Sequence, residues 1–298
     1  MSAKAPLSTT HQSVPMINFT KSPILAPLVL ILLASVLSAV EAEEGAAASK
    51  DGWVRLFNGM DLSGWTPKIT GYPCGENALD TFQVDDGILK VSYENYEKFE
   101  KRYGHLYSNI PYAHYRLRME YRFTGKMMTD APGYVNLNSG VMIHSQSPQS
   151  MGIDQEFPVS LEFQFLADEG KGARQTGNVC TPGTNLEIDG ELVTQHIVKS
   201  SAPTFPAEEW VKIEIEVRGN ETVIHRVNGK EVLRYQRPQL DPEGRVVVTH
   251  ARRVIRRIHR RGGVVEYAVV LQGLIAVGTA FRDVEHAEVV AAELHAKP

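Results

Sequence analysis

The sequence predicts an all-β sandwich that begins near residue 51, and two observations carry this prediction. Residues 115–123 alternate apolar and mostly charged side chains, and residues 211–218 repeat that alternation, which is typical of strands with one buried face. Residues 223–227 and 231–235 flank Asn228-Gly229, a pair that favours a tight hairpin turn. Since no long amphipathic helical pattern lies between residues 51 and 240, the fold class expected is a β-sandwich.

Composition limits the classes of protein that the chain can belong to. The 298 residues are 43% hydrophobic and 22% charged, as in a globular domain with a real core. A net charge of −4 argues against a nucleic-acid binder, and two cysteines are too few for a disulfide-dense scaffold or a cysteine-rich metal site. The domain lacks P-loop, GxGxxG, HExxH, GxSxG and CxxC patterns, so nucleotide, flavin and serine-hydrolase chemistry are unsupported.

The N-terminus has the pattern of an export signal. Residues 24–40 are mostly apolar, Lys21 supplies a positive charge before them, and Val40-Glu41-Ala42 suits signal-peptidase cleavage. We expect residues 1–42 to be a signal peptide, with Met16 as an alternative start, and residues 43–50 to be a linker. The protein is then secreted or periplasmic, with no membrane contact beyond this segment; an uncleaved anchor is the alternative.

Residues 51–65, DGWVRLFNGMDLSGW, are the most informative stretch of the chain. A short apolar strand leads into an Asn58-Gly59 turn, and Trp65 follows as an aromatic anchor. The motif resembles the opening of the secreted 3-keto-disaccharide hydrolase family, and further matching stretches extend to about Asp241, among them GHLYSNIPYAHYRLRMEYRF and NSGVMIHSQSPQSMGIDQEFPVSLEFQFL. This resemblance implies a concanavalin A-like or jelly-roll sandwich, over residues 51–245, that acts on 3-keto sugars.

Residues 246–298 are an atypical tail. The family continues with the pattern Gly-x-Ile-x-Leu-Gln-x-Glu-x-His-Pro-x-Glu-Phe-Arg, which closes its sandwich and which this chain does not reproduce cleanly. The tail instead contains HARRVIRRIHRRGG, and we interpret it either as an altered reading frame or as a divergent tail. Residues 264–270 and 271–277 are β-prone enough to occupy the vacant strand position. Residues 252–261 are expected to be poorly ordered or an isolated helix.

Two polar patterns on predicted strands are the candidate site. Residues 160–165, SLEFQF, place Glu162 and Gln164 on one face, about 7 Å apart along the strand. Residues 138–145 place His144 with Gly140 and Met142 on one face, and a histidine can act as a general base or ligate a metal. The alternative for the polar row is an ordinary solvent-facing surface.

The resemblance adds roles to individual residues. It implies that His144 and Glu162 belong to the family's polar pocket as catalytic residues, while Asn138, Gln164 and His196 bind substrate. Asp154 and Glu156 lie in one loop and are candidate ligands for a divalent metal ion, the only cofactor that we consider. The family subgroup has a His-Cys pair where this chain has His196-Ile197, so Cys180 is either unpaired or bonded to Cys74.

These features lead to a functional prediction with two alternatives. The resemblance implies a secreted enzyme that cleaves 3-keto-glycosides by base-initiated elimination and hydration, or by net hydrolysis, with a carbohydrate as substrate. The alternatives are a non-catalytic, lectin-like carbohydrate-binding module and an interaction domain of the cell envelope.

Overall fold

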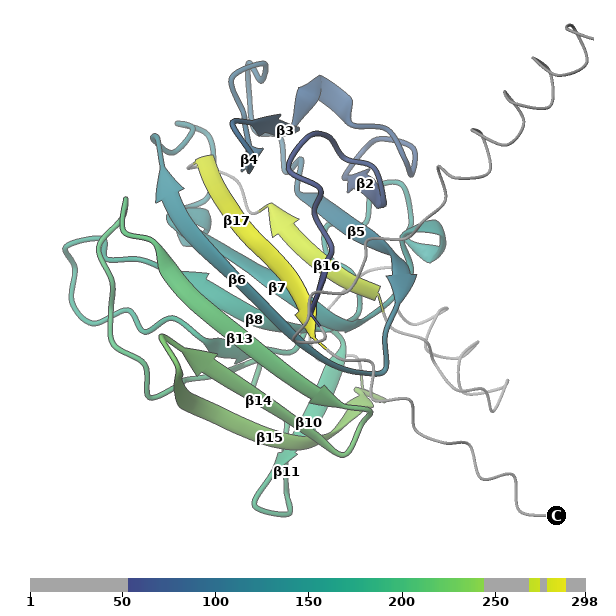
Figure 1. The fold of residues 1–298 in the computed structure, drawn as a ribbon, viewed down its shortest axis with the longest axis vertical. Coiled ribbons are helices and arrows are strands. Elements are labelled where there is room, and N and C mark those ends of the chain that lie inside the picture. The colour runs from purple at the N-terminus through teal and green to yellow at the C-terminus, as the bar shows by residue number, and fades with distance from the viewer. Residues whose placement is uncertain (1–52, 244–267, 274–277, 288–298) are drawn as a thin grey trace, which may run out of the picture. The chain divides into compact units, whose positions relative to one another are not determined.

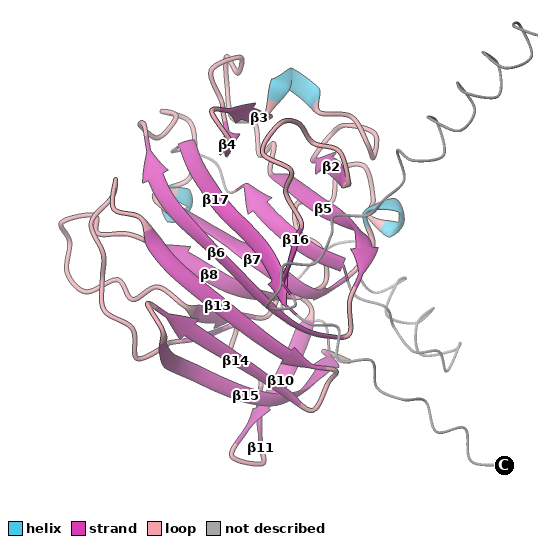
Figure 2. Cartoon of the chain, in the orientation of Figure 1, coloured by secondary structure: helices cyan, strands magenta, loops and turns pink. Residues whose placement is uncertain are grey.

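The computed structural model describes residues 53–243, 268–273 and 278–287, the last two as backbone only. The predicted signal peptide, linker and basic segment 252–261 lie outside these residues. Strands account for nearly all regular structure (Figure 2), and helical structure in the described ranges is limited to short 3-10 turns: η2 (Ala78–Asp80), η3 (Gly133–Val135) and η4 (Pro148–Ser150). Within the same ranges, no helix has the length and apolar character needed to span a bilayer.

Two antiparallel sheets form the sandwich (Figure 1). Sheet A has the order β11-β10-β15-β14-β13-β6-β17-β4-β3, with β1 paired to β17. Its strands are β1 (Trp53–Arg55), β3 (Phe82–Asp85), β4 (Ile88–Val91), β6 (His114–Thr124), β10 (Thr184–Ile188), β11 (Glu191–Val193), β13 (Val211–Arg218), β14 (Thr222–Val227), β15 (Lys230–Leu240) and β17 (Gly278–Ala287).

Sheet B has the order β12-β9-β8-β7-β16-β5-β2. Its strands are β2 (Trp65–Ile69), β5 (Gly104–Pro111), β7 (Asn138–Ser145), β8 (Leu161–Leu166), β9 (Asn178–Cys180), β12 (Ile197–Val198) and β16 (Ala268–Gly273).

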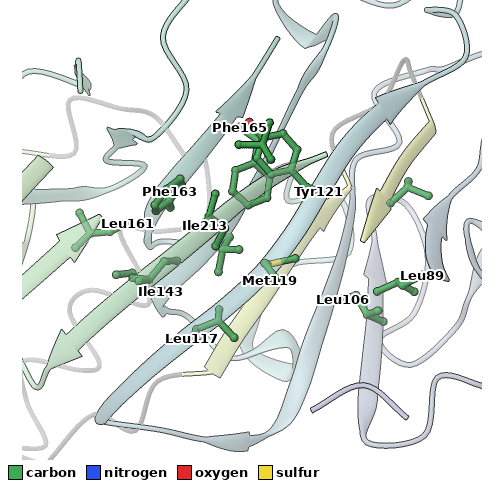
Figure 3. Close-up of a cluster of buried hydrophobic side chains, with 14 of the residues drawn as sticks. Leu89, Leu106, Leu117, Met119, Tyr121, Ile143, Leu161, Phe163, Phe165 and Ile213 are labelled. Carbon is green, nitrogen blue, oxygen red and sulfur yellow. The ribbon is translucent and has the colours of Figure 1, made fainter. Parts of the chain in front are cut away.

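The main core lies between the two sheets, where alternate residues of each strand meet (Figure 3). Sheet A contributes Leu117, Met119 and Tyr121 from β6, and sheet B contributes Phe163 and Phe165 from β8. The rings of Tyr121 and Phe165 stack across the sandwich with centroids 4.1 Å apart and planes 5° apart. This packing assigns the opposite face of each strand of sheet B to the outside of the sandwich.

The predicted strand patterns are confirmed. Residues 115–123 and 211–218 lie in the neighbouring strands β6 and β13, with their apolar sides buried. Asn228 (φ 47°) and Gly229 (φ 77°) join β14 to β15 in the left-handed conformation that such a turn needs. In the opening motif, Gly59 has φ 76° and the Nε1 of buried Trp65 donates to the Leu56 carbonyl at 3.0 Å.

Two strands of the sandwich come from the tail. β16 lies between β5 and β7 in sheet B, and β17 lies between β6 and β4 in sheet A (yellow in Figure 1). The predicted domain ends at residue 245, before both strands, whereas in the structure β16 and β17 are part of the two sheets of the sandwich. Each fills an inner position whose two neighbours would otherwise have unpaired backbone edges.

Candidate functional site

The outer face of sheet B carries two cross-strand rows of residues, which the strand register defines. The first, called the His105 row, runs across six strands through Lys68, His105, Gln272, Gly140, Gln164 and Asn178. The second, called the Tyr107 row, runs beside it through Thr66, Tyr107, Val270, Met142, Glu162 and Cys180. Polar residues thus gather on one face from strands that are far apart in the sequence.

Glu162 is the most unusual group on this face. Its side chain is buried, and its Oε1 finds no hydrogen-bond partner within the described residues. Burial raises the pKa of this carboxyl from 4.5 to about 8, and a hydrogen bond with the Cys180 thiol opposes this rise. At neutral pH Glu162 is therefore a protonated acid that can donate a proton, a property common at catalytic sites.

Gly140 makes room for that carboxyl. A Cβ atom at this position would lie 2.7 Å from Glu162 Oε1 and 2.8 Å from the Phe163 carbonyl oxygen. The carboxyl consequently leans over β7, toward β16 and β5, and His105 Cα lies about 10 Å from the Gly140 backbone, two strand spacings away.

Amide side chains lie next to Glu162 on the same face. The Nδ2 group of Asn178 donates to Gln164 Oε1 at 3.1 Å, and both side chains are buried. Asn138 lies two residues before Gly140, donates from Nδ2 to the Tyr134 carbonyl at 2.9 Å, and has a buried Oδ1 without a partner in the described parts of the chain. The Asn178 amide is fully used, because it also donates to the Gln175 carbonyl and accepts from the Ser200 N–H. Gln164 and Asn138 are therefore the amides that suit the hydroxyls of a sugar, which both donate and accept.

His105 is a base with a fixed tautomer. Its Nε2 lies 2.8 Å from the Glu156 carbonyl oxygen, and since a carbonyl can only accept, Nε2 carries the proton. Nδ1 therefore holds a lone pair, is buried, and has no partner in the described ranges. Burial, opposed by the Glu156 carbonyl and assisted by the charge of Lys68, lowers the pKa of His105 to about 4 and keeps the ring neutral.

Lys68 places a fixed positive charge beside His105. Its buried Nζ donates to the carbonyls of Ile69 at 3.0 Å, Tyr72 at 3.2 Å and Ile153 at 3.2 Å, which occupies all of its N–H groups. Burial lowers its pKa, and the charge acts on the site through space.

The segment 146–157 covers the β2–β5 side of this face. Met151 Sδ accepts a hydrogen bond from the Tyr107 hydroxyl at 2.9 Å, and the centroids of the Phe157 and His105 rings lie 6.1 Å apart. Asp154 and Glu156, the predicted metal ligands, belong to this segment. Glu156 pairs with Lys101 at 3.1 Å, and the described residues hold no cluster of three His, Cys, Asp or Glu side chains suited to a metal ion. The predicted pair therefore does not form a metal centre within the described residues.

The structure does not place His144 on the face where its strand alternation predicts it. His144 has φ 49°, at a point where the pairing of β16 with β7 shifts register. This irregularity turns the side chain away, and Nε2 lies 2.9 Å from the Gly219 carbonyl in the β13–β14 turn of sheet A. The structure thus brings together Glu162, Gln164 and Asn138 and separates His144 from them.

The remaining predicted residues lie at the margin. His196 is exposed beside β12, where Ile197 pairs directly with Cys180. Both cysteines are free, Cys74 exposed and Cys180 buried, so the disulfide alternative is wrong.

Sequence reasoning missed His105, Lys68, Tyr107 and Asn178. The sequence held a signal for two of them, since His105 and Tyr107 flank Leu106, a core residue. Strand alternation then places both side chains on the face opposite the core. The two cross-strand rows could not be predicted from the sequence, because they depend on which strands are neighbours in the sheet.

Fold and face together define an antiparallel sandwich with a buried acid, a neutral imidazole and amides on one sheet. The chain belongs to the 3-keto-alpha-glucoside-1,2-lyase-like domain family, whose model matches residues 52–265. The match ends before β16 and β17.

Several solved structures resemble this fold distantly. A putative glycosyl hydrolase from Parabacteroides distasonis is 14% identical with a TM-score of 0.45, over 80% of this chain and 99% of that one. The Bacillus licheniformis beta-glucanase is 12% identical with a TM-score of 0.45, over 80% and 100%. The VIP36 exoplasmic/lumenal domain, bound to Ca2+ and Man2, is 6% identical with a TM-score of 0.43, over 81% and 89%. No curated protein matches the chain.

Proposed function

We propose that this protein is a secreted enzyme that cleaves 3-keto-glycosides by proton abstraction, elimination and hydration. The observation that carries the proposal is Glu162, a buried carboxyl with an unpartnered oxygen on the polar face of a sandwich from this family. An uncompensated buried carboxyl costs stability, so its presence favours a functional role.

The chemistry follows from the ketone. A carbonyl at C3 acidifies the hydrogen on C2, a base removes that proton, and the resulting enolate expels the substituent on C1. The departing oxygen takes up a proton, and water then adds to the unsaturated sugar, so the net change is hydrolysis. Such a site needs a base and an acid in different protonation states at the same pH.

Two residues of the face meet this requirement. Neutral His105, with its lone pair on Nδ1, is suited to accept the C2 proton, and protonated Glu162 is suited to donate to the departing oxygen. The charge of Lys68 favours the enolate, and the amide of Gln164, which Asn178 holds in place, suits the ring hydroxyls. His144, as placed here, is a structural residue in this scheme.

Release of the leaving group from a chromogenic 3-keto-glucoside tests the proposal, with the matching glucoside as control and with arms that do and do not contain a chelator. We expect release only from the keto substrate, and a primary kinetic isotope effect when C2 carries deuterium. Equal rates with both substrates, or rates insensitive to deuterium at C2, contradict elimination. Tight binding without turnover favours the lectin-like module, and loss of activity with chelator would show that a metal ion takes part.

Export is part of the same proposal. It is supported by the apolar segment 24–40 and the small residues before Glu43. Mass spectrometry of the protein from its native host should find Glu43 as the N-terminus; an intact N-terminus on cytoplasmic protein contradicts it.

A further inference from the structure

Two buried glutamines lie beside the site, and the proposed reaction does not use them. Gln146 and Gln155 are 6% and 1% exposed, and both belong to segment 146–157, which also provides the partner of His105. Burial of a side-chain amide costs free energy unless its N–H and carbonyl groups find partners. The partners of these two amides therefore indicate what the pair holds in place.

The two amides bind each other and the chain on both sides of Glu156. Gln155 Nε2 donates to Gln146 Oε1 at 2.8 Å and to the Phe157 carbonyl at 2.7 Å. Gln155 Oε1 accepts from the Gly152 N–H at 3.1 Å. The chain before and after Glu156 is thus tied to one side chain, which fixes the peptide units between them.

Gln146 fastens this arrangement to sheet B. It directly follows β7, its backbone N–H donates to the Val159 carbonyl at 2.7 Å, and its Oε1 accepts from the Val159 N–H at 3.2 Å. Gln146 Nε2 donates to the Ser150 carbonyl at 2.9 Å. On the other side the hydroxyl of Thr70, the residue after β2, donates to the Gln155 carbonyl at 3.3 Å. The amide pair is therefore attached to the ends of two strands of the sheet.

The Glu156 carbonyl that the pair holds is the partner of His105. The His105 Nε2 lies 2.8 Å from that oxygen, the ring is buried, and the proton on Nε2 leaves the lone pair on Nδ1. If the carbonyl moved away, Nε2 would lose its acceptor and the ring would exchange between its two neutral tautomers. In the second tautomer Nδ1 carries the proton and cannot act as a base.

We propose that Gln146 and Gln155 are positioning residues, whose amide pair holds the Glu156 carbonyl on His105 and so keeps the lone pair on Nδ1. The proposal rests on the proposed function, because it assigns the support of the base in the same reaction. The pair acts on the reaction only through the ring.

The ring-nitrogen NMR signals of His105 in the full chain test the proposal without turnover. Wild type should show one neutral tautomer with a solvent-protected proton on Nε2. Gln155→Met keeps the length of the side chain and removes its hydrogen bonds, so it should lose that proton signal and show both tautomers. Gln146→Met removes the other amide and should do the same, so that a second variant decides the question if one does not fold.

The matched control is Gln149→Met, at an exposed position of the same segment, which should give the wild-type spectrum. A wild type with mixed tautomers, or a folded variant of Gln146 or Gln155 with the wild-type spectrum, overturns the positioning role.

Kinetics on a 3-keto-glucoside provide the second readout. Gln155→Met should lower kcat at least about tenfold with little change in KM, because a displaced base impairs proton transfer more than binding. Gln149→Met should keep the wild-type kcat. Loss of the Nε2 proton signal with an unchanged kcat overturns the proposal. A wild type that cleaves no 3-keto-glucoside overturns the proposed function, and the ring signals still decide whether the pair holds His105.

Discussion

Replacement of Glu162 by glutamine should stabilise the protein, and the gain should grow with pH. The side chain keeps its shape and loses its ability to ionise, so the variant isolates the cost of a buried carboxyl. In the unfolded chain this carboxyl ionises near 4.5, whereas burial raises its pKa in the folded chain to about 8. Between these values the folded state binds the extra proton, so wild-type stability falls as pH rises through this window.

The magnitude follows from the two values. A shift from 4.5 to about 8, at about 1.36 kcal/mol per pH unit, corresponds to an upper limit of about 5 kcal/mol. The Glu162→Gln variant escapes this cost. The two proteins should differ by about 1 kcal/mol or less near pH 4, where both side chains are neutral, and by several kcal/mol above about pH 8.

Urea unfolding at constant ionic strength across this pH range measures the difference, and Glu76→Gln, at an exposed position, serves as the control. A stability difference between wild type and Glu162→Gln that does not change with pH would refute the reasoning. It would mean that Glu162 is solvated or paired, and the acid assigned to the site would be lost.

Three further predictions concern Glu162, Gly140 and the buried histidines. The kcat/KM for a 3-keto-glucoside should fall as pH rises through about 8, where Glu162 loses its proton, and a pH–rate profile flat to about pH 10 contradicts this. Gly140→Ala should abolish turnover and destabilise the chain by about 1–3 kcal/mol, since the new Cβ meets both Glu162 and the Phe163 carbonyl; a fully active variant would show that the carboxyl lies elsewhere. Burial lowers the pKa of His105 and of His225 from 6.5 to about 4, so as pH falls the unfolded chain binds protons on these residues before the folded chain does. In a Glu162→Gln background the free energy of unfolding should therefore decrease as pH falls from 6.5 to 4. A urea midpoint that does not change over this range argues against buried neutral rings.

Strand periodicity was enough to predict the architecture, because alternation decides which side of a strand is buried. The apolar sides of β6 and β13 and the Asn228-Gly229 hairpin follow from local pattern and turn chemistry alone. The same reasoning placed Glu162 and Gln164 on one face correctly.

Alternation failed where the backbone departs from it. His144 sits at a register irregularity with positive φ, and one such residue reverses the side to which a side chain points. His105 was overlooked because it becomes a neighbour of the site only through β16, which lies more than 160 residues further along the chain.

The tail strands were partly visible in the sequence. Leu271-Gln272 of β16 and Phe281-Arg282 of β17 repeat two pairs of the family's closing pattern, with one more residue between them. The intervening residues and the preceding basic segment differ from that pattern, which concealed the relationship. Resequencing of the locus remains the direct test of the altered reading frame.

The central claim is that the outer face of sheet B, with Glu162 and His105, performs the reaction. The most direct measurement compares kcat/KM on a 3-keto-glucoside for His105→Ala, Glu162→Gln and the matched histidine variant His144→Ala, with folding checked by urea unfolding. The structure predicts a loss of at least about a hundredfold for the first two variants, the usual scale for a general acid or base, and a folded His144→Ala variant that keeps most of its activity. Loss of activity in folded His144→Ala together with wild-type rates in His105→Ala would contradict the account and return the reaction to His144.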